Sequence, residues 1–197
     1  MKGARLRIDL RSYWHSGGGT SGGATADALV QRDAHGLPVV PGRHLKGLLR
    51  EAVAAAGDWG WSGYTGLAEH LFGERSVEGE RVPAPGCLRV GDARLRSDLA
   101  DWLAETEEGR ALRPGFYRTL HATAIDHRSG TALDRSLRGV EVTVPLQLVA
   151  RVTPVSDRVP AAWMTRLGEV LPLIRAVGAQ RSRGLGRAVL TLEEEAA

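Results

Sequence analysis

Alternating apolar and polar positions predict the strands of this chain. Residues 4–10 alternate along their whole length, and so does the segment 87–95, which is typical of half-buried strands. The run 140–152 is rich in β-branched residues and has the clearest strand pattern in the sequence. A short apolar stretch at 188–192 predicts a last strand.

The longest helical pattern follows Pro41 and is expected to end at Gly57. Its apolar residues recur at spacings of three and four positions, which places them on one face of a helix. They are Leu45, Leu48, Leu49, Ala52, Val53 and Ala56. Arg43, Lys46 and Arg50 share a second, polar face of the same helix.

Gly47 lies inside this predicted helix, where glycine costs up to about 1 kcal/mol relative to alanine. Its presence suggests that something approaches the helix backbone closely. The start of a helix has unpaired N–H groups and the positive end of the helix dipole, so it suits a phosphate. An ordinary surface helix with a solvated basic face would give the same pattern, and from the pattern alone it is the simpler interpretation.

A second helix is predicted from Pro160 to about Val177, with Pro172 inside it as a residue that should kink or split it. Shorter helical segments are expected at 67–73 and around 98–105.

Three segments predict loops or turns. Residues 11–26 are too rich in glycine for regular structure and predict a flexible loop. In the segment 121–139 two short arms flank the turn dipeptide Ser129–Gly130, which indicates a hairpin or an extended lobe. Residues 179–187 form a basic glycine loop before the last strand.

Without its loops the chain has the order β-α-β-β-α-β. This order predicts an α+β fold of the ferredoxin-like, or RNA-recognition-like, type, in which two helices cover one face of a four-stranded antiparallel sheet. The open face of such a sheet is a common RNA platform. With 197 residues the chain is long enough for one domain, so we predict a single domain over 1–197 with the hairpin 121–139 inserted in it.

Composition limits the kinds of disulfide, membrane segment and charged partner that the protein can have. Lys and Arg number 26 against 23 Asp and Glu, so the net charge of +3 is mild and the basic residues act through local clusters. The single cysteine, Cys87, excludes an internal disulfide framework. The charged, alternating N-terminus is unlike a signal peptide, and no apolar run approaches the ~18 residues of a membrane span. We expect a cytoplasmic protein without membrane contacts.

Several segments, which follow one another over most of the chain, together resemble the RAMP superfamily, the repeat-associated proteins of CRISPR systems. The more specific ones are GLPVVPGRHLKGLLR at 36–50 and GAQRSRGLGR at 178–187. The others are WHSGGG at 14–19, the D-x5-D pattern of Asp27 and Asp33, LFG at 71–73, LRVGDARL at 88–95, AIDHRSGTA at 124–132 and VEVTVP at 140–145. Within the superfamily, AIDHRSGTA resembles the backbone subunits of type III (Csm/Cmr) effector complexes.

The resemblance implies a subunit that polymerises with further copies of itself along a CRISPR RNA, beside other effector subunits. It implies that the first helix contacts the RNA backbone through Lys46 and Arg50. Arg43 and His44 stand where the family often has small hydroxyl residues, so their roles as RNA contacts stay open.

The resemblance also assigns roles to the terminal loop and to the hairpin. It implies that Arg181, Arg183 and Arg187 of the loop contact the RNA backbone. The segment 121–139, which carries Arg128, would be a thumb that wedges between nucleotides. Arginine suits such contacts because its guanidinium group can bind phosphate with two N–H groups.

Asp27 is the candidate for catalysis and for metal binding. The resemblance implies that a loop acid at this position cuts a complementary target RNA with a divalent metal such as Mg²⁺. One carboxylate can hold a hydrated Mg²⁺ together with RNA phosphates, and such a metal can activate a 2′-hydroxyl. A lone loop aspartate is more often a turn residue, which is the role expected for Asp33 before Gly36.

Two alternatives remain open. The protein could bind the guide RNA without cutting, as a purely structural subunit. It could also be a metal-independent endonuclease that processes CRISPR transcripts, with His15 near the RNA as general acid or base. The thumb-like segment argues against the processing enzyme, which has no need of a wedge.

Overall fold

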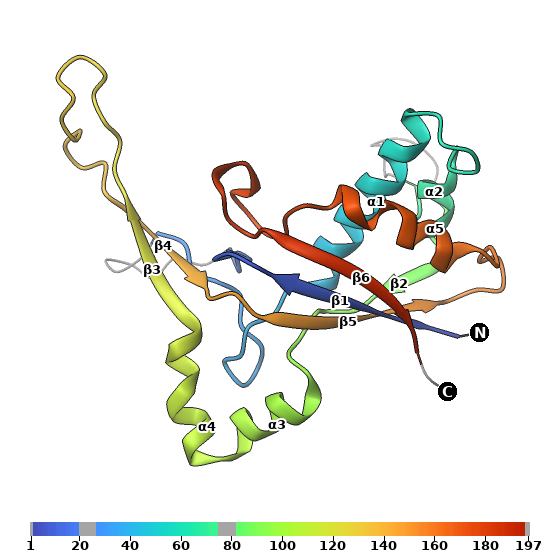
Figure 1. The fold of residues 1–197 in the computed structure, drawn as a ribbon, viewed down its shortest axis with the longest axis horizontal. Coiled ribbons are helices and arrows are strands. Elements are labelled where there is room, and N and C mark those ends of the chain that lie inside the picture. Colours follow the sequence, from blue (N-terminus) through green and yellow to red (C-terminus); the bar gives the residue numbers. More distant parts are fainter. Residues whose placement is uncertain (1, 20–26, 75–81, 196–197) are drawn as a thin grey trace.

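A four-stranded antiparallel sheet forms the centre of the computed structural model, which describes residues 2–19, 27–74 and 82–195 (Figure 1). Its strands are β1 (Ala4–Leu10), β2 (Leu88–Val90), β5 (Gln147–Pro154) and β6 (Ala188–Glu194). The spatial order is β2-β5-β1-β6. In chain order these are the second, third, first and fourth strands, as a β-α-β-β-α-β fold requires. The predicted α+β, ferredoxin-like fold is confirmed.

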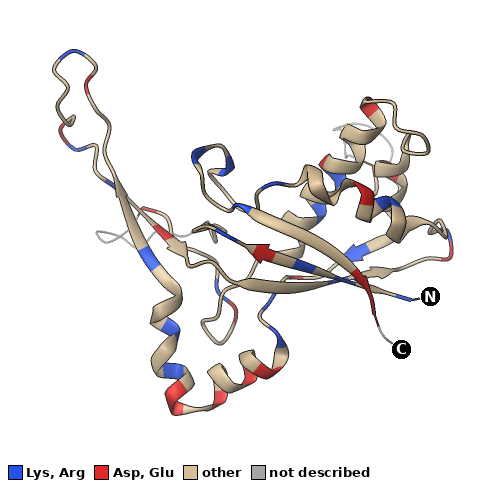
Figure 2. Cartoon of the chain, viewed as in Figure 1, with Lys and Arg blue, Asp and Glu red and all other residues tan. Residues whose placement is uncertain are grey.

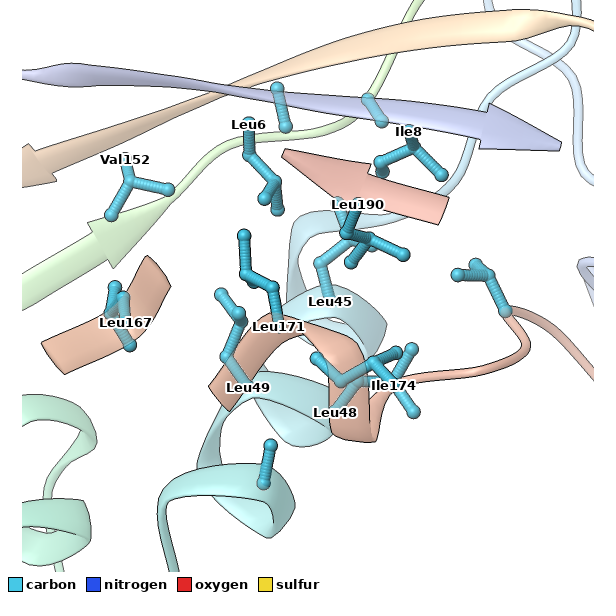
Figure 3. Close-up of a cluster of buried hydrophobic side chains, with 14 of the residues drawn as sticks. Leu6, Ile8, Leu45, Leu48, Leu49, Val152, Leu167, Leu171, Ile174 and Leu190 are labelled. Atoms are coloured by element: carbon cyan, nitrogen blue, oxygen red, sulfur yellow. The ribbon is translucent and has the colours of Figure 1, made fainter. Parts of the chain in front are cut away.

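Three helices cover one face of this sheet: α1 (Gly42–Asp58), α2 (Leu67–Phe72) and α5 (Trp163–Val170) (Figure 1). The apolar stripe predicted for α1 is the buried face of that helix. Figure 3 shows Leu45, Leu48 and Leu49 in one cluster with Leu171 and with Leu190 of the sheet. All three are at most 4% exposed, so replacing one with alanine should cost about 2–5 kcal/mol of folding free energy. This packing fixes α1 on the sheet.

The second long helix is shorter than predicted. α5 ends at Val170 and a single 3₁₀ turn, Leu171–Leu173, follows it. Pro172 lies in that turn, so the prediction that it would split the helix is confirmed, whereas the predicted extension to Val177 is wrong. The amide of Val177 instead donates to the carbonyl of Gly186, 2.8 Å away, because this part of the chain pairs with the end of the terminal loop.

The run 140–152 is not one strand, as its pattern predicted. It contains most of β4 (Arg138–Thr143) and the first part of β5, which belong to different sheets and are separated at Pro145. β4 pairs with β3 (Tyr117–Ala122) in a two-stranded sheet. The lobe 123–137 joins these two strands and projects away from the central sheet (Figure 1). We call β3, this lobe and β4 the thumb.

A helical arm connects the central sheet to the thumb. It consists of α3 (Ser97–Glu105), α4 (Glu107–Leu112) and a 3₁₀ turn, Arg113–Phe116. The helix predicted around 98–105 is confirmed, whereas α4 was not predicted. Thr106 starts α4, because its Oγ1 accepts a 3.0 Å hydrogen bond from the amide of Gly109.

The strand predicted at 87–95 is correct only at its beginning. β2 ends at Val90, after which Ala93 and Arg94 form isolated bridges with Val40 and Val149. Among the residues that the structure describes, no helix is both long and apolar enough to cross a bilayer.

Candidate nucleic-acid interface

Helix α1 begins against the end of β2. A Cβ on Gly42 would collide with the carbonyl oxygen of Val90, so only glycine fits this approach. The amide of Gly42 donates a 2.9 Å hydrogen bond to Oδ1 of Asp92, and this bond is the main cause of a lowered pKa at Asp92. One of the N–H groups at the helix start is therefore bound by a carboxylate of the protein itself.

The basic face of α1 is open to solvent in its first half. Arg43 is exposed and Lys46 is half-buried, and neither forms an ion pair within the described part of the chain. A Cβ on Gly47 would meet nothing within 4 Å, so a ligand could reach the helix backbone there. Arg50 is more confined, since its guanidinium lies 3.4 Å from Glu69 and its side chain is 18% exposed.

His44 connects α1 to the terminal loop. Its Nε2 accepts a 2.9 Å hydrogen bond from the amide of Gly178, which lies 134 residues further along the chain. An imidazole nitrogen that accepts a hydrogen bond must be deprotonated, so His44 is neutral in this arrangement. Burial lowers its pKa, and the positive charge of Arg181 lowers it further.

The terminal loop, residues 178–187, owes its shape to glycines. Gly178 and Gly186 have φ angles of +99° and +72°. A Cβ at either position would also collide with a backbone carbonyl oxygen, that of His15 or of Val177. These contacts hold the two ends of the loop against the fold and leave its middle free.

The arginines predicted as RNA contacts lie on the exposed part of this loop. Arg181 and Arg183 are the first and last residues of a 3₁₀ turn, and Arg187 precedes β6. All three are exposed, and within the part of the chain that the structure describes only Arg181 has a nearby acid, Glu51, at 3.7 Å. Figure 2 shows Lys and Arg on this loop and at the tip of the thumb, both of which rise on the side of the sheet that carries α1.

His15 lies under the terminal loop and not on the surface. It is 5% exposed, and its Nδ1 lies 2.7 Å from the carbonyl oxygen of Glu141. Its own carbonyl accepts a 2.7 Å hydrogen bond from the amide of Ala179. His15 therefore supports the loop at 178–179 from inside the fold, and a direct contact with RNA would require the loop to move.

Asp27 lies beside the thumb, at the end of its two strands where the lobe begins. Its Oδ2 accepts a 2.9 Å hydrogen bond from the amide of Gly139, and its own amide donates to the carbonyl of Gly139 at 2.8 Å. Ala28 continues this contact as a parallel bridge to Val140. The aspartate is exposed, yet its backbone and one carboxylate oxygen are bound to the first residues of β4.

The surroundings of Asp27 limit the number of protein ligands that a metal ion could have there. No group of three or more His, Cys, Asp or Glu side chains that could hold an ion occurs in residues 2–19, 27–74 and 82–195. Oδ1 of Asp27 has no partner within these ranges and could supply a single ligand. This donor set fits Mg²⁺, which commonly binds one or two carboxylates and keeps water and phosphate oxygens as its other ligands.

Asp33 shapes a turn, as expected from the sequence. Its Oδ1 accepts hydrogen bonds from the amides of His35 and Leu37, at 2.9 and 3.0 Å, and Gly36 occupies the positive-φ position at +76°. Its Oδ2 lies 3.3 Å from Arg94. With both oxygens bound, Asp33 does not join Asp27 in a site.

The thumb tip combines a cation with exposed apolar side chains. Arg128 lies in the turn 126–130, where its amide donates a 2.9 Å hydrogen bond to Oδ1 of Asp126. Ile125, Leu133 and Leu137 are 49–70% exposed along the same lobe. Such side chains have no core to bury them in the isolated chain, so this surface is suited to contact a ligand or a partner.

Two arginines near the terminal loop were missed by the sequence reasoning. Arg11 and Arg175 line a hollow of about 520 Å³ together with Arg181 and Arg187. Arg11 follows the end of β1, and Arg175 follows the turn after α5, so the sequence places neither in a motif. The sequence indicated them only by position: Arg11 directly follows the predicted strand 4–10, and Arg175 lies shortly before the glycine loop.

Comparison with known proteins identifies the family and supports the fold. The family model for the RAMP superfamily matches residues 7–189. A cryo-EM structure of the type III-B Cmr-beta complex bound to cognate target RNA contains a chain with a TM-score of 0.70 at 12% identity, covering 98% of this chain and 97% of that one. A second chain, from Cmr-beta in the apo state, gives 0.70 and 12% with 97% coverage of both. No curated protein matches the sequence.

Proposed function

Because the chain belongs to the RAMP superfamily, we propose that it is a backbone subunit of a type III CRISPR effector complex, which binds a guide RNA. The observation that carries this proposal is the hydrogen bond between His44 and Gly178, which joins the first turn of α1 to the arginine loop. The helix that carries Arg43 and Lys46 is thereby held next to the loop that carries Arg181 and Arg183. Fixed arginines and open glycine backbone suit contacts to RNA phosphates, which position a strand without reading its sequence.

The thumb supports a contact with more than one molecule. In an extended assembly its exposed tip would lie between a guide and a target RNA, with Ile125 and Leu133 against unstacked bases. Further copies of the chain would bind the same guide at regular intervals, beside other effector subunits. The partners are thus a CRISPR RNA, a target RNA and protein subunits, in the cytoplasm.

We also propose that Asp27 cuts the target RNA beside the thumb. Its free oxygen Oδ1 would bind a divalent metal such as Mg²⁺. When bound, the metal would supply charge stabilisation at the scissile phosphate and help to activate a nucleophile. The role of the protein is to hold the carboxylate at a fixed place relative to β4, through the two hydrogen bonds with Gly139.

A structural subunit that does not cut is the second candidate. It is favoured by the hydrogen bond from Gly139 to Asp27, which gives the aspartate a purely architectural role beside the strands of the thumb. The processing-endonuclease alternative has less support, because His15 is buried and bound to the carbonyl of Glu141.

The proposal is tested with the purified protein, a guide RNA and a labelled complementary RNA. Binding of the guide that weakens with salt is the expected result, with target cleavage that stops when EDTA removes divalent metal. Guide binding without cleavage would favour the structural subunit. Cleavage that survives EDTA would exclude the Asp27–metal hypothesis, and a chain that binds no RNA would refute the proposed function as a whole.

A further inference from the structure

A groove runs beside the segment 174–181 and extends to Trp59 at the end of α1. The hollow of about 520 Å³ that Arg11 and Arg187 line shares Arg175 and Arg181 with a second hollow of about 450 Å³. The second hollow lies between the later part of α1 and the chain after α5, and Trp59 lines it. We call the two together the arginine groove. Each half has the volume of a small-molecule site.

Trp59 is unusual among the aromatic residues of this chain. It caps the C-terminus of α1 and is 64% exposed, without a ring partner in the described residues. Trp61, two positions later, is 38% exposed and packs its edge against Tyr64, with ring centroids 5.7 Å apart. An indole ring that is left exposed beside a hollow offers a flat surface to a planar ligand.

Two cations of the groove, Arg175 and Arg181, are available for a ligand, whereas Arg11 forms an ion pair with Asp9 at 3.1 Å. Arg175 is exposed, and its side chain has no hydrogen bond or ion pair in residues 2–19, 27–74 and 82–195. Arg181 has one weak partner, Glu51, at 3.7 Å, which also lines the second hollow. A carboxylate this close to the groove disfavours a ligand made of phosphate alone. It is compatible with a ligand that brings a base as well as a phosphate, since base N–H groups can donate to a carboxylate.

Aromatic rings beside arginines are what single-stranded nucleic acid requires: bases stack on the rings and the backbone follows the positive charges. We propose that the arginine groove binds one nucleotide of single-stranded RNA, with its base stacked on Trp59 and the adjoining phosphates at Arg175 and Arg181. This inference rests on the proposed function, because Arg181 belongs to the terminal loop already assigned to the guide RNA. It adds a base platform to the phosphate contacts proposed for α1 and the terminal loop.

The direct test uses a short single-stranded RNA that carries 5-iodouridine, irradiated in complex with the full chain. The cross-linked peptide should contain Trp59, because photo-coupling requires the iodinated base to lie against the ring. Trp59→Ala should lower affinity on the order of tenfold, as the loss of one stacked base does. Trp59→Phe should restore most of the affinity, and Trp61→Ala is the matched control that should bind as the wild type does.

A second measurement addresses the phosphates. Arg175→Ala should weaken binding of all sequences and reduce the slope of log affinity against log salt by about 0.7 to 1. Melting temperatures equal to that of the wild type would show that the exposed substitutions leave the fold intact. The free mononucleotides UMP and AMP should bind far more weakly than the oligonucleotide, since only a strand also reaches the terminal loop.

The outcomes separate this inference from the proposed function. If Trp59→Ala and Arg175→Ala bind RNA like the wild type while Arg183→Ala binds more weakly, the groove is not part of the interface and the proposed function stands. A cross-link at Trp61 or in the thumb, with none at Trp59, would also overturn the inference alone. A wild-type chain that binds no RNA would overturn both.

Discussion

The amide of Gly178 donates a hydrogen bond to Nε2 of His44. This bond connects a helix to a loop, although the two residues lie 134 positions apart in the sequence. Residue His44 belongs to α1, the helix with the open basic face, and Gly178 is the first residue of the terminal loop. The bond requires a neutral imidazole, so the contact between α1 and the terminal loop depends on the protonation state of one histidine.

A pH dependence follows from this bond. Burial lowers the pKa of His44 below its ordinary value of 6.5, so the unfolded chain binds more protons than the folded one below that pH. Stability from this residue is complete above pH 6.5 and is lost as the pH falls towards the lower native pKa. We expect the free energy of unfolding, measured by urea titration, to drop more for the wild type than for His44→Gln between about pH 7.5 and about pH 5.5.

The control lies within the same experiment. The Gln amide oxygen can still accept from Gly178 and does not titrate, so His44→Gln should stay within about 1 kcal/mol of the wild type at the higher pH. An equal loss in both proteins on acidification would show that His44 does not carry the effect.

The salt dependence of guide RNA binding should separate free arginines from paired ones. Arg183 has no acidic partner in the described residues, so Arg183→Ala should weaken binding of every sequence and reduce the salt slope by about 0.7 to 1. Lys46→Ala should act in the same way. Arg96→Ala is the matched control, because Arg96 lies before α3 and is bound to Asp98. Filter binding at several salt concentrations gives these slopes, and a change at Arg96 as large as at Arg183 would contradict the assigned interface.

Glycine substitutions in the terminal loop should differ in their cost. Both Gly184 and Gly186 have positive φ angles, +87° and +72°. A methyl group at Gly184 meets nothing within 4 Å, so Gly184→Ala should cost about 1–2 kcal/mol from backbone strain alone. Gly186→Ala should cost more, because the same group would collide with the carbonyl oxygen of Val177. Thermal unfolding compares the two, and equal melting temperatures would refute the collision.

Two substitutions at Asp27 should distinguish a catalytic role of this residue from a role in stabilising the fold. The Asn side chain keeps an oxygen that can accept from Gly139, whereas Ala removes it. Asp27→Asn should therefore abolish metal-dependent cleavage with little loss of stability, and Asp27→Ala should also lose about 0.5–1.5 kcal/mol. Guide RNA affinity should remain unchanged in both. Gel assays of target cleavage, read beside urea titrations, test this pair, and cleavage by Asp27→Asn at the wild-type rate would leave Asp27 with the structural role alone.

The start of α1 offers a fifth test. The carboxylate of Asp92 caps the helix at Gly42, so Asp92→Ala should destabilise the fold by about 0.5–2 kcal/mol near neutral pH. The pKa of Asp92 is lowered in the fold, so this contribution is present above the ordinary value of 3.8 and is lost as the pH falls through the native value. The Asp92→Asn variant should retain most of the stability. Urea midpoints against pH give the comparison, and a difference between Asp92→Ala and the wild type that persists below the native pKa would argue against the cap.

The sequence predicted the central sheet because β1 and α1 have undisturbed patterns that match their burial. It failed at the run 140–152, where the strand pattern continues without interruption although the chain changes sheets at Pro145. A proline is compatible with the end of a strand, so it could not reveal that two sheets were involved. The missed helix α4 had a signal, a threonine followed by Glu107 and Glu108, which is typical of a helix start.

The candidate site could be predicted only where its residues lie in one segment of the sequence. The basic face of α1 follows from residue spacing, and the loop arginines follow from one short segment. The burial of His15 depends on Glu141, 126 residues away, and the attachment of Asp27 depends on Gly139, 112 residues away. Such long-range contacts leave no trace in local patterns, which is also why Arg175 was overlooked.

The attachment of Asp27 to Gly139 fixes the distance between the aspartate and the thumb within each chain. The aspartate and the thumb are held in register by two hydrogen bonds within one molecule. In an assembly of many copies, slack between neighbours would change the distance from one thumb to the next. It would leave the offset between each aspartate and its own thumb unchanged, so errors in that offset would not accumulate along the filament.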